Sequence, residues 1–571
     1  MGFGATRSLE RVAAAMGELE AAPIVFEAAR DVPQGGVLLA LPALLAVGLL
    51  RRGEELYALP PGFYGLPSVM VLLALLALAR VRSIEQLRYQ AAGEWGTLLG
   101  LNRVPEVRTL REKLRLLCTE RGRAARWNAA LAEEWIGQRE SQQESGLAFY
   151  VDGHVRVYHG ELTKLPRHYV PRERFSMRAT VDYWVNALDG EPFCYFNQAV
   201  DHGLVRAMRA DVLPWLETHV TVPAEHRERM AADPHVPRFT VVFDREGYSP
   251  DLFAELRQQR IAALTYHRYP DGENWGAEEF QEQTVKLVSG ERVRMKLAER
   301  GTRVGSRPGL WVREVRKLGT GGHQVSIVST NFSGDAAAQA VALMARWSQE
   351  NFFKYMREHF GLDALVQYGT EEIPATVTVV NPAWQALNRA VRQKHRELKS
   401  LQKLQQRVSL DQPLSEAVVR TYEQHQGNLQ EAIEQLQPAL DLLRQKRKQT
   451  PRQIPVQLLP EADRFAQLRM ERKYFLDTIQ MIAYRAETSM ASTLRETLRR
   501  SDGARALLRQ VYDTEVDLIP DPEAKTLTVH LHHLTQAAHD TAVRYLCDEL
   551  TATETIFPAT DLRLVYKLGS G

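Results

Sequence analysis

Two short runs of apolar residues in the middle of the chain are each followed directly by an aspartate. The first is LAFYV (147–151), followed by Asp152, and the second is FTVVF (239–243), followed by Asp244. Such runs predict strands of a sheet that is covered on both faces. An ionised aspartate belongs at the end of such a strand, where α/β folds place their functional sites. The pattern therefore predicts an α/β domain with two carboxylates at one edge of its sheet.

The segments around these two runs support the same fold. Ser249 is suited to cap a helix that follows it, and the apolar run at 261–266 predicts a further strand. Asp189-Gly190 predicts a hairpin turn, and Gly153 predicts a turn that ends the first strand. Strands that alternate with helices predict a sheet with helices on both faces.

The flanking parts of the chain have other patterns. Residues 1–140 read as helix throughout, and residues 267–328 read as antiparallel strands inserted into the α/β domain. Residues 381–571 begin with apolar side chains at mostly heptad spacing and end in mixed strands and helices. Heptad spacing is typical of a helical hairpin, an internal antiparallel coil or a dimer seam. The heptad residues are Trp384, Leu387, Val391, Leu398, Leu401 and Val408. The predicted divisions are 1–140, 145–266, 267–328, 329–380 and 381–571.

Composition excludes several classes of protein. The net charge is only +2, so a nucleic-acid binder must concentrate its cations locally. The three cysteines lie far apart and predict neither a disulfide framework nor a zinc site. The apolar runs 37–50 and 69–81 are shorter than the roughly 20 residues that span a bilayer, so we expect buried helices and no membrane partner. Signal-peptide and nucleotide-binding patterns are absent, which predicts a cytoplasmic protein without a nucleotide cofactor.

A third carboxylate lies in the segment RWSQENFFKYMR (346–357). Arg346, Glu350, Lys354 and Arg357 are three or four residues apart, so a helix places them on one face. We expect this helix to pack across the edge that carries the two aspartates. Three converging carboxylates repel one another unless a cation lies between them, and oxygen ligands favour Mg²⁺ or Mn²⁺. Two such ions about 4 Å apart promote phosphodiester chemistry, and the flanking cations are suited to hold phosphates.

The order of these residues resembles a known family. An aspartate in YVDGH, an aspartate in VVFDREGY, a β-rich insertion and an Arg-x-x-x-Glu helix are similar to the DDE transposases of bacterial insertion sequences. The resemblance is to the cut-and-paste group with a Tyr, Arg, Glu, Lys helix signature. Arg346 and Glu350 match the Arg and the Glu, Arg357 replaces the Lys, and Leu343 replaces the Tyr. The resemblance covers residues 145–370 and implies an α/β, RNase H-like catalytic domain with a β-rich insertion. We expect it between an all-helical N-terminal domain and a helical C-terminal region that ends in mixed α/β.

The resemblance also implies the chemistry. Asp152, Asp244 and Glu350 are the expected catalytic and metal-binding residues, with two Mg²⁺ or Mn²⁺ ions. The expected reaction is cleavage at the ends of the element and transfer of the 3′ ends to target DNA. A dimer on double-stranded DNA with terminal inverted repeats is the expected assembly. Two alternatives stay open: a transposase-derived DNA-binding or assembly protein that does not cleave, and a related metal-dependent nuclease.

Cations in the N-terminal segment predict a DNA contact. Between residues 102 and 126 there are eight Lys or Arg residues against three Glu. Arg108, Arg111 and Arg115 share one helical face. One interpretation is a helix-turn-helix that binds the ends of the element, and the other is a helical bundle with a basic rim.

Several further residues are weaker candidates. Rivals for the third acid are Glu278, Glu279 and Asp335. His154 is expected on a strand surface. Trp275 and Trp311 either stack on a flipped base or pack in a core. The basic run 444–453 is a second DNA contact or a solvated linker. Four histidines are expected to be structural because no acid or cysteine is spaced to complete a metal site: His530, His532, His533 and His539.

Overall fold

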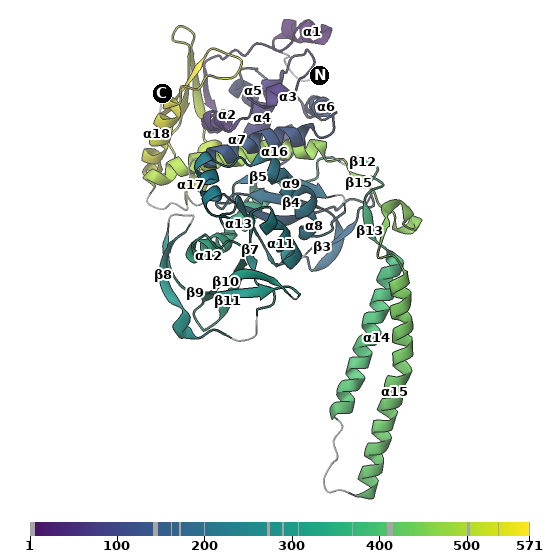
Figure 1. Cartoon of the computed structure of the whole chain (residues 1–571). Helices are drawn as coiled ribbons and strands as arrows, with labels where there is room; N and C mark the ends of the chain where they lie inside the picture. Colours follow the sequence, from purple (N-terminus) through teal and green to yellow (C-terminus); the bar gives the residue numbers. More distant parts are fainter. Residues whose placement is uncertain are drawn as a thin grey trace. The chain divides into compact units, whose positions relative to one another are not determined.

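A computed structural model of the chain describes residues 6–140, 147–161, 163–170, 173–198, 200–270, 274–287, 291–306, 308–367, 369–407, 415–498, 503–534 and 536–569. The chain divides into two compact units (Figure 1). The larger unit contains Met1–Tyr158, His168–Gly369 and Arg469–Gly571, and the smaller unit contains His159–Arg167 and Thr370–Leu468. Most of the smaller unit is therefore one long insertion in the sequence of the larger unit.

The larger unit is built around a mixed sheet whose central strands are parallel. β2 pairs parallel with β6, and β6 pairs parallel with β7. β4 pairs antiparallel with both β2 and β5, and β11, β10, β9 and β8 continue the sheet beyond β7 as antiparallel strands. The protein is a mixed α/β fold, as predicted. The strands are β2 (Ala148–Val157), β3 (Arg167–Val170), β4 (Phe175–Asn186), β5 (Pro192–Gln198), β6 (Phe239–Phe243), β7 (Ile261–Tyr266), β8 (Gln281–Lys286), β9 (Arg292–Val304), β10 (Leu310–Leu318) and β11 (Gln324–Ser329).

Two features of this sheet differ from the expectation. β2 runs straight through Asp152 and Gly153, so no turn ends the strand there. Its second half stays extended because it pairs with β4, although its pairing with β6 stops at Val151. The antiparallel strands predicted at 267–328 are present, but they extend the main sheet because β11 pairs with β7.

Helices accompany the strands of this sheet. Ser249 caps α11 by accepting a hydrogen bond from the Leu252 N–H (3.3 Å), as predicted. A separate helix, α12, lies between β11 and the helix that carries Glu350, which therefore does not follow the strand directly. The helices are α8 (Leu204–Ala207), η3 (Met208–Val212), α9 (Leu213–His219), α10 (Ala224–Ala232), η4 (Arg245–Gly247), α11 (Pro250–Gln258), η5 (Ala277–Glu279), α12 (Ala336–Met344), α13 (Trp347–Tyr355) and η6 (Met356–Phe360).

The N-terminal helices share one apolar core with the C-terminal segments of the same unit. Buried side chains of α2, α4 and α7 pack in one cluster with those of α16 and α17. The elements before β2 are α1 (Ser8–Met16), β1 (Ala29–Val32), η1 (Gly35–Ala40), α2 (Leu41–Val47), α3 (Gly53–Leu56), α4 (Leu66–Leu78), η2 (Ile84–Tyr89), α5 (Ala92–Leu98), α6 (Val107–Leu117) and α7 (Arg123–Glu140). Those at the other end are α16 (Glu471–Thr497), α17 (Ala504–Asp513), β16 (Val516–Asp521), β17 (Thr526–Leu531), α18 (Ala537–Ala552) and β18 (Arg563–Leu568).

The sequence predicts helix throughout the N-terminal segment, but the structure contains a strand there. β1 pairs with β16 and joins a sheet in the order β1-β16-β17-β18. The all-helical prediction was wrong because the partner of β1 lies near the opposite end of the chain and leaves no local pattern. The apolar runs 37–50 and 69–81 lie buried in the core, as expected. Among the described residues, no helix is both long enough and apolar enough to cross a membrane.

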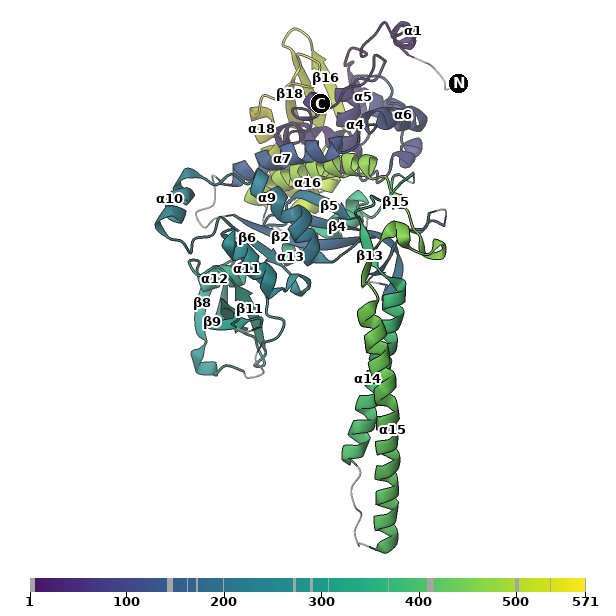
Figure 2. The same cartoon turned by 45° about the vertical axis from the view of Figure 1, so that its right-hand side comes forward.

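The smaller unit contains a helical hairpin (Figure 2). α14 (Pro382–Arg407) and α15 (Glu416–Gln449) lie side by side and antiparallel. Val391 and Leu398 of α14 are buried against Leu440 of α15, so the predicted apolar seam joins these two helices. Val408 lies outside the described residues. The remaining elements are β12 (Thr370–Glu371), β13 (Thr378–Val380), β14 (Gln453–Pro455), η7 (Val456–Leu458), η8 (Glu461–Asp463) and β15 (Gln467–Leu468).

Candidate active site

Asp152 and Asp244 come from neighbouring strands at the same edge of the parallel sheet. The pairing of β2 with β6 ends at Val151 and Phe243, and each aspartate is the next residue. Parallel strands end at the same edge, so the two carboxylates are brought together by the register of the sheet. The predicted meeting of these two residues is therefore present in the structure.

The surroundings of Asp152 disfavour its charged form. Removal from water raises the pKa of this carboxyl to about 7, Arg346 opposes the shift, and Asp244 adds to it by repulsion. The Gly153 N–H donates a hydrogen bond to Asp152 Oδ1 (2.9 Å). A carboxylate in such a place is stabilised by any cation that approaches it.

The third carboxylate, Glu350, lies on α13, which is fastened to the turn between β4 and β5. The Gln349 side chain donates a hydrogen bond to Asn186 Oδ1 (2.9 Å), and Ser348 Oγ donates to the Leu188 carbonyl (2.8 Å). A Cβ at Gly190 of this turn would lie 2.6 Å from the Ser348 carbonyl oxygen. The β4–β5 connection therefore packs closely against the first residues of α13.

Aromatic side chains hold the next turn of α13. Phe353 stacks on His154 of β2 with ring centroids 5.0 Å apart, and Phe352 packs against Trp184. His154 Nε2 lies 2.7 Å from Asp363 Oδ1. His154 is buried, so the expected surface position was wrong, because α13 packs on this face of β2. The helix that carries Glu350 is thus held firmly above β2.

Arg346 joins the carboxylates of the two elements. Its Nη1 donates a hydrogen bond to Asp152 Oδ2 (3.1 Å), and its Nη2 donates to Glu350 Oε1 (2.9 Å). The Arg346 side chain is 18% exposed, against 44% for Glu350. One guanidinium therefore neutralises part of the charge of both acids.

The chemical type of the ligand atoms at this site suits a hard divalent cation. Asp152, Asp244 and Glu350 offer only carboxylate oxygens, which Mg²⁺ and Mn²⁺ prefer. No set of three oxygens, one from each of these acids, lies with all of its members within 4.8 Å of one another. Since Arg346 is bonded to both Asp152 and Glu350, its guanidinium must move before the three acids can share ions.

Glu246, an acid that the sequence analysis passed over, lies beside this site. Its N–H donates a hydrogen bond to Asp244 Oδ1 (2.8 Å). Removal from water raises the pKa of Glu246, and repulsion from Asp244 raises it further. Its charge also contributes to the raised pKa of Asp152. The signal available in the sequence was the Asp-x-Glu spacing in FDREGY.

Comparison with known proteins identifies the family to which this chain belongs. The family described as "Transposase protein" matches residues 2–570. The chain belongs to this transposase family. No curated protein matches it. Transposases act on DNA, so the predictions of a transposase and of a DNA partner are confirmed.

The cations of the α13 segment lie at its two ends. Arg346 lies at the N-cap of α13, and Lys354 is exposed in its last turn. Arg357 is the second residue of the π-helical segment that begins at Met356. Leu343, which stands in place of the Tyr of the helix signature that the sequence resembles, is buried in α12. Contacts of these cations with DNA remain predictions.

Two rivals for the third acid have other roles in the transposase. Glu279 forms an ion pair with Arg300. Asp335 caps α12 by accepting a hydrogen bond from the Ala338 N–H (3.2 Å). The third rival, Glu278, lies exposed in η5.

The two candidate tryptophans differ in their surroundings. Trp275 is buried, with Arg300 and Arg316 over its ring, so it packs in a small core. Trp311 is half exposed, and Arg303 lies over its ring. Of the two, only Trp311 presents a ring surface to solvent.

The basic residues of the N-terminal segment are largely paired with glutamates. We call Arg103, Arg108, Arg111, Arg115, Arg123 and Arg126 the α6 patch. Arg111 pairs with Glu85, and Arg115 pairs with Glu112 (2.7 Å). The other ion pairs of the patch are Arg103–Glu106, Arg123–Glu120 and Arg126–Glu120. Arg108 is exposed, and among the described residues no ion pair holds it. DNA binding by Arg108, Arg111 and Arg115 stays a prediction.

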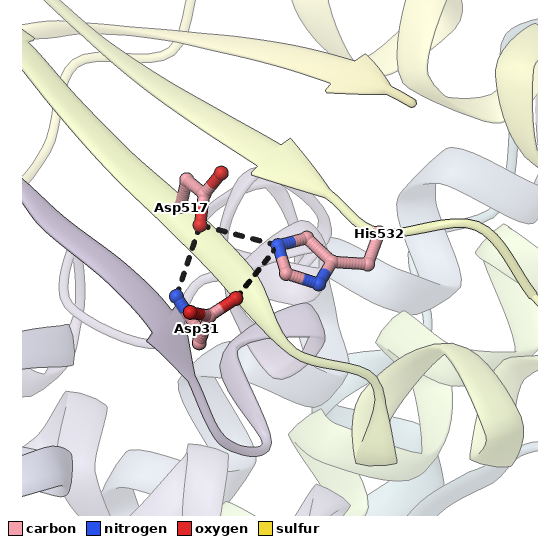
Figure 3. A group of neighbouring side chains, drawn as sticks. All are labelled: Asp31, Asp517 and His532. Carbon is pink, nitrogen blue, oxygen red and sulfur yellow. Dashed lines mark hydrogen bonds and ion pairs between the residues drawn. The ribbon is translucent and has the colours of Figure 1, made fainter. Parts of the chain in front are cut away.

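His532 has acidic neighbours that the sequence analysis did not anticipate (Figure 3). Its Nε2 lies 3.1 Å from Asp517 Oδ1 and 3.7 Å from Asp31 Oδ1. The Asp31 N–H also donates a hydrogen bond to Asp517 Oδ1 (2.9 Å). Sequence spacing does not reveal Asp31 as a neighbour, because pairing of β1 with β16 brings it in from the other end of the chain. These contacts connect β1, β16 and the end of β17.

Proposed function

We propose that this transposase is of the DDE type, with Asp152, Asp244 and Glu350 as its catalytic carboxylates. The observation that carries the proposal is the convergence of the three elements: two aspartates follow paired strands, and Arg346 bonds Asp152 to Glu350. Support for an RNase H-like core comes from β4, which pairs antiparallel with β2 and β5, and from β6 and β7, which run parallel to β2.

Each residue has a role in this proposal. The three carboxylates would hold two Mg²⁺ or Mn²⁺ ions, which would supply activation of the attacking oxygen and stabilisation of the leaving oxygen. Arg346 neutralises the acids in the free protein and turns to a DNA phosphate when the strand is bound, since its fork matches phosphate oxygens. Lys354 and Arg357 extend this contact along the strand.

The proposed substrate is double-stranded DNA at the terminal inverted repeats of a bacterial insertion sequence. Cleavage there frees 3′ ends, which are transferred to target DNA by a dimer in the cytoplasm. Strand transfer separates this reaction from that of a nuclease, because joined products appear only when a freed 3′-hydroxyl attacks the target.

The substitution Glu350→Gln tests the proposal. It keeps the size of the side chain and removes one negative charge from the metal-binding set, so cleavage of end DNA in Mg²⁺ should fall by on the order of 10³-fold or more. DNA binding should hold or become tighter, because a carboxylate that faces phosphates is neutralised. Cleavage, joined products and binding are measured with end-labelled DNA.

Glu358→Gln is the matched control. Glu358 is an exposed acid of η6, the segment that continues α13, and its substitution removes the same charge outside the site. The control should cleave at the wild-type rate. Cleavage by Glu350→Gln at a rate near that of the control contradicts the proposed triad.

A further inference from the structure

One face of α14 carries a row of exposed cations. Successive members are three or four residues apart, so they lie on one side of the helix. The α14 stripe consists of Arg389, Arg392, Arg396, Lys399, Lys403 and Arg407, and all six are exposed. It is distinct from the basic run 444–453 of the same hairpin.

The stripe lies away from the apolar seam of the hairpin. Val391 and Leu398 are buried against α15, and at about 100° per residue the stripe falls on a different side of α14. The single acid of α14, Glu397, pairs with Lys394 (2.8 Å), and both lie outside the stripe. Within the described part of the chain, no carboxylate forms an ion pair with any of the six stripe cations.

Three of the five cations in the basic run 444–453 differ from those of the stripe. Arg444 pairs with Asp441 (3.0 Å), Arg447 donates a hydrogen bond to Asn388 (3.0 Å), and Arg452 lies over the ring of Trp384. These three cations take part in the packing of the hairpin. In the described part of the hairpin, the stripe cations form no ion pair, and Arg396 donates a hydrogen bond only to the Arg392 carbonyl of its own helix (3.4 Å).

We propose that the α14 stripe is a second DNA-binding surface, which holds the phosphate backbone of double-stranded DNA. The stripe spans residues 389–407, a length of about 27 Å at roughly 1.5 Å per residue. This corresponds to about eight base pairs of B-DNA. Evenly spaced, uncompensated Arg and Lys side chains are the groups that bind phosphates and release counterions. The surface holds DNA without reading its sequence, and it is separate from the proposed cleavage site.

Salt-dependent binding by the full-length protein tests the inference. The stripe variant carries Arg396→Gln, Lys399→Gln and Lys403→Gln. The control carries Lys394→Gln, Arg420→Gln and Arg444→Gln, which removes three cations of the same hairpin that are already in ion pairs. Binding to a duplex of arbitrary sequence is followed by fluorescence anisotropy in EDTA, so the result does not depend on the cleavage site.

The stripe variant should show a shallower dependence of log affinity on log salt, by about 2 to 3 in slope. Its affinity at about 0.1 M salt should fall on the order of 10- to 100-fold. The control should stay close to wild type. An unchanged slope for the stripe variant, or an equal loss in the control, overturns the proposal.

A footprint on the unmodified protein provides an independent measurement. DNA should protect Lys399 and Lys403 from acetylation, whereas Lys525, an exposed lysine paired with Asp561 in the larger unit, should react as before. If the stripe serves an acidic protein surface instead, duplex DNA leaves both stripe lysines as reactive as in the free protein. That outcome also overturns the proposal.

Discussion

The α6 patch and the α14 stripe are both groups of basic residues. Among the described residues, most cations of the patch are paired with glutamates, whereas no cation of the stripe has a carboxylate partner. In the patch, Arg111 and Arg115 are each held by a glutamate. In the stripe, no carboxylate of the described residues pairs with a cation. A carboxylate partner lowers the charge that a phosphate meets, and it must be displaced before the arginine can bind. The local pairing of cations therefore matters more for DNA binding than their number.

Arg346 extends the comparison to the candidate active site, where we expect the largest effect of removing a single cation. Arg346→Gln removes the guanidinium that bonds both Asp152 and Glu350. Cleavage should fall by about 10- to 100-fold because the strand is positioned less well. The Mg²⁺ concentration for half-maximal cleavage should also fall, since no cation competes for the two acids. Single-turnover cleavage across a Mg²⁺ series measures both quantities.

Arg346→Lys is the matched control for this prediction. It keeps the positive charge but loses the planar fork that contacts two carboxylates at once. Its Mg²⁺ requirement should lie between those of wild type and Arg346→Gln. A higher Mg²⁺ requirement in Arg346→Gln contradicts the idea that Arg346 and the metal compete for the same carboxylates.

Neutralising three arginines of the α6 patch should affect binding less than neutralising three cations of the stripe. In the variant Arg108→Gln, Arg111→Gln and Arg115→Gln, only Arg108 lacks a carboxylate partner among the described residues. We expect the salt slope for a duplex of arbitrary sequence to change by about 1. A change as large as that of the stripe variant would show that the ion pairs of the free protein do not limit DNA binding.

Removing the acids of the patch should have the opposite effect. Glu85→Gln and Glu112→Gln together release Arg111 and Arg115. The affinity for DNA should rise several-fold, with a slope steeper by about 1 to 2. Glu397→Gln, which releases Lys394 away from the stripe, serves as the control and should change little. Anisotropy titrations at several salt concentrations measure both variants.

The smallest expected effect is on stability. Arg396 lies four residues from Arg392, and like charges at this spacing destabilise isolated helices by about 0.2–0.5 kcal/mol per pair. Arg396→Gln should therefore stabilise the hairpin slightly. Arg115→Gln loses an ion pair and should lower the unfolding midpoint slightly. Urea unfolding followed by circular dichroism gives both signs, and equal signs would contradict the difference in pairing.

Much of the sheet could be predicted from local patterns. The apolar runs before Asp152 and Asp244 indicated neighbouring buried strands, and the structure places both aspartates at one edge of the parallel sheet. Ser249 could be predicted as a helix cap because capping depends on residues three apart. These predictions hold because their physical causes act over a few residues of chain.

Other features had no local cause. β2 passes through Asp152 without a turn because a partner strand continues beside it, and β1 is a strand only because β16 pairs with it. The neighbours of His532 and the burial of His154 depend in the same way on residues far away in the sequence.

The sequence alone determined which residues carry charge and how they are spaced along each helix. Only the tertiary structure decided which charges are compensated. Glu85 of η2 pairs with Arg111 of α6. Arg346 pairs with Asp152, which comes from a strand far away in the sequence. The α14 stripe stays uncompensated because the apolar seam turns the opposite side of the helix toward α15. Electrostatic pairing depends on distance in space, and folding sets that distance.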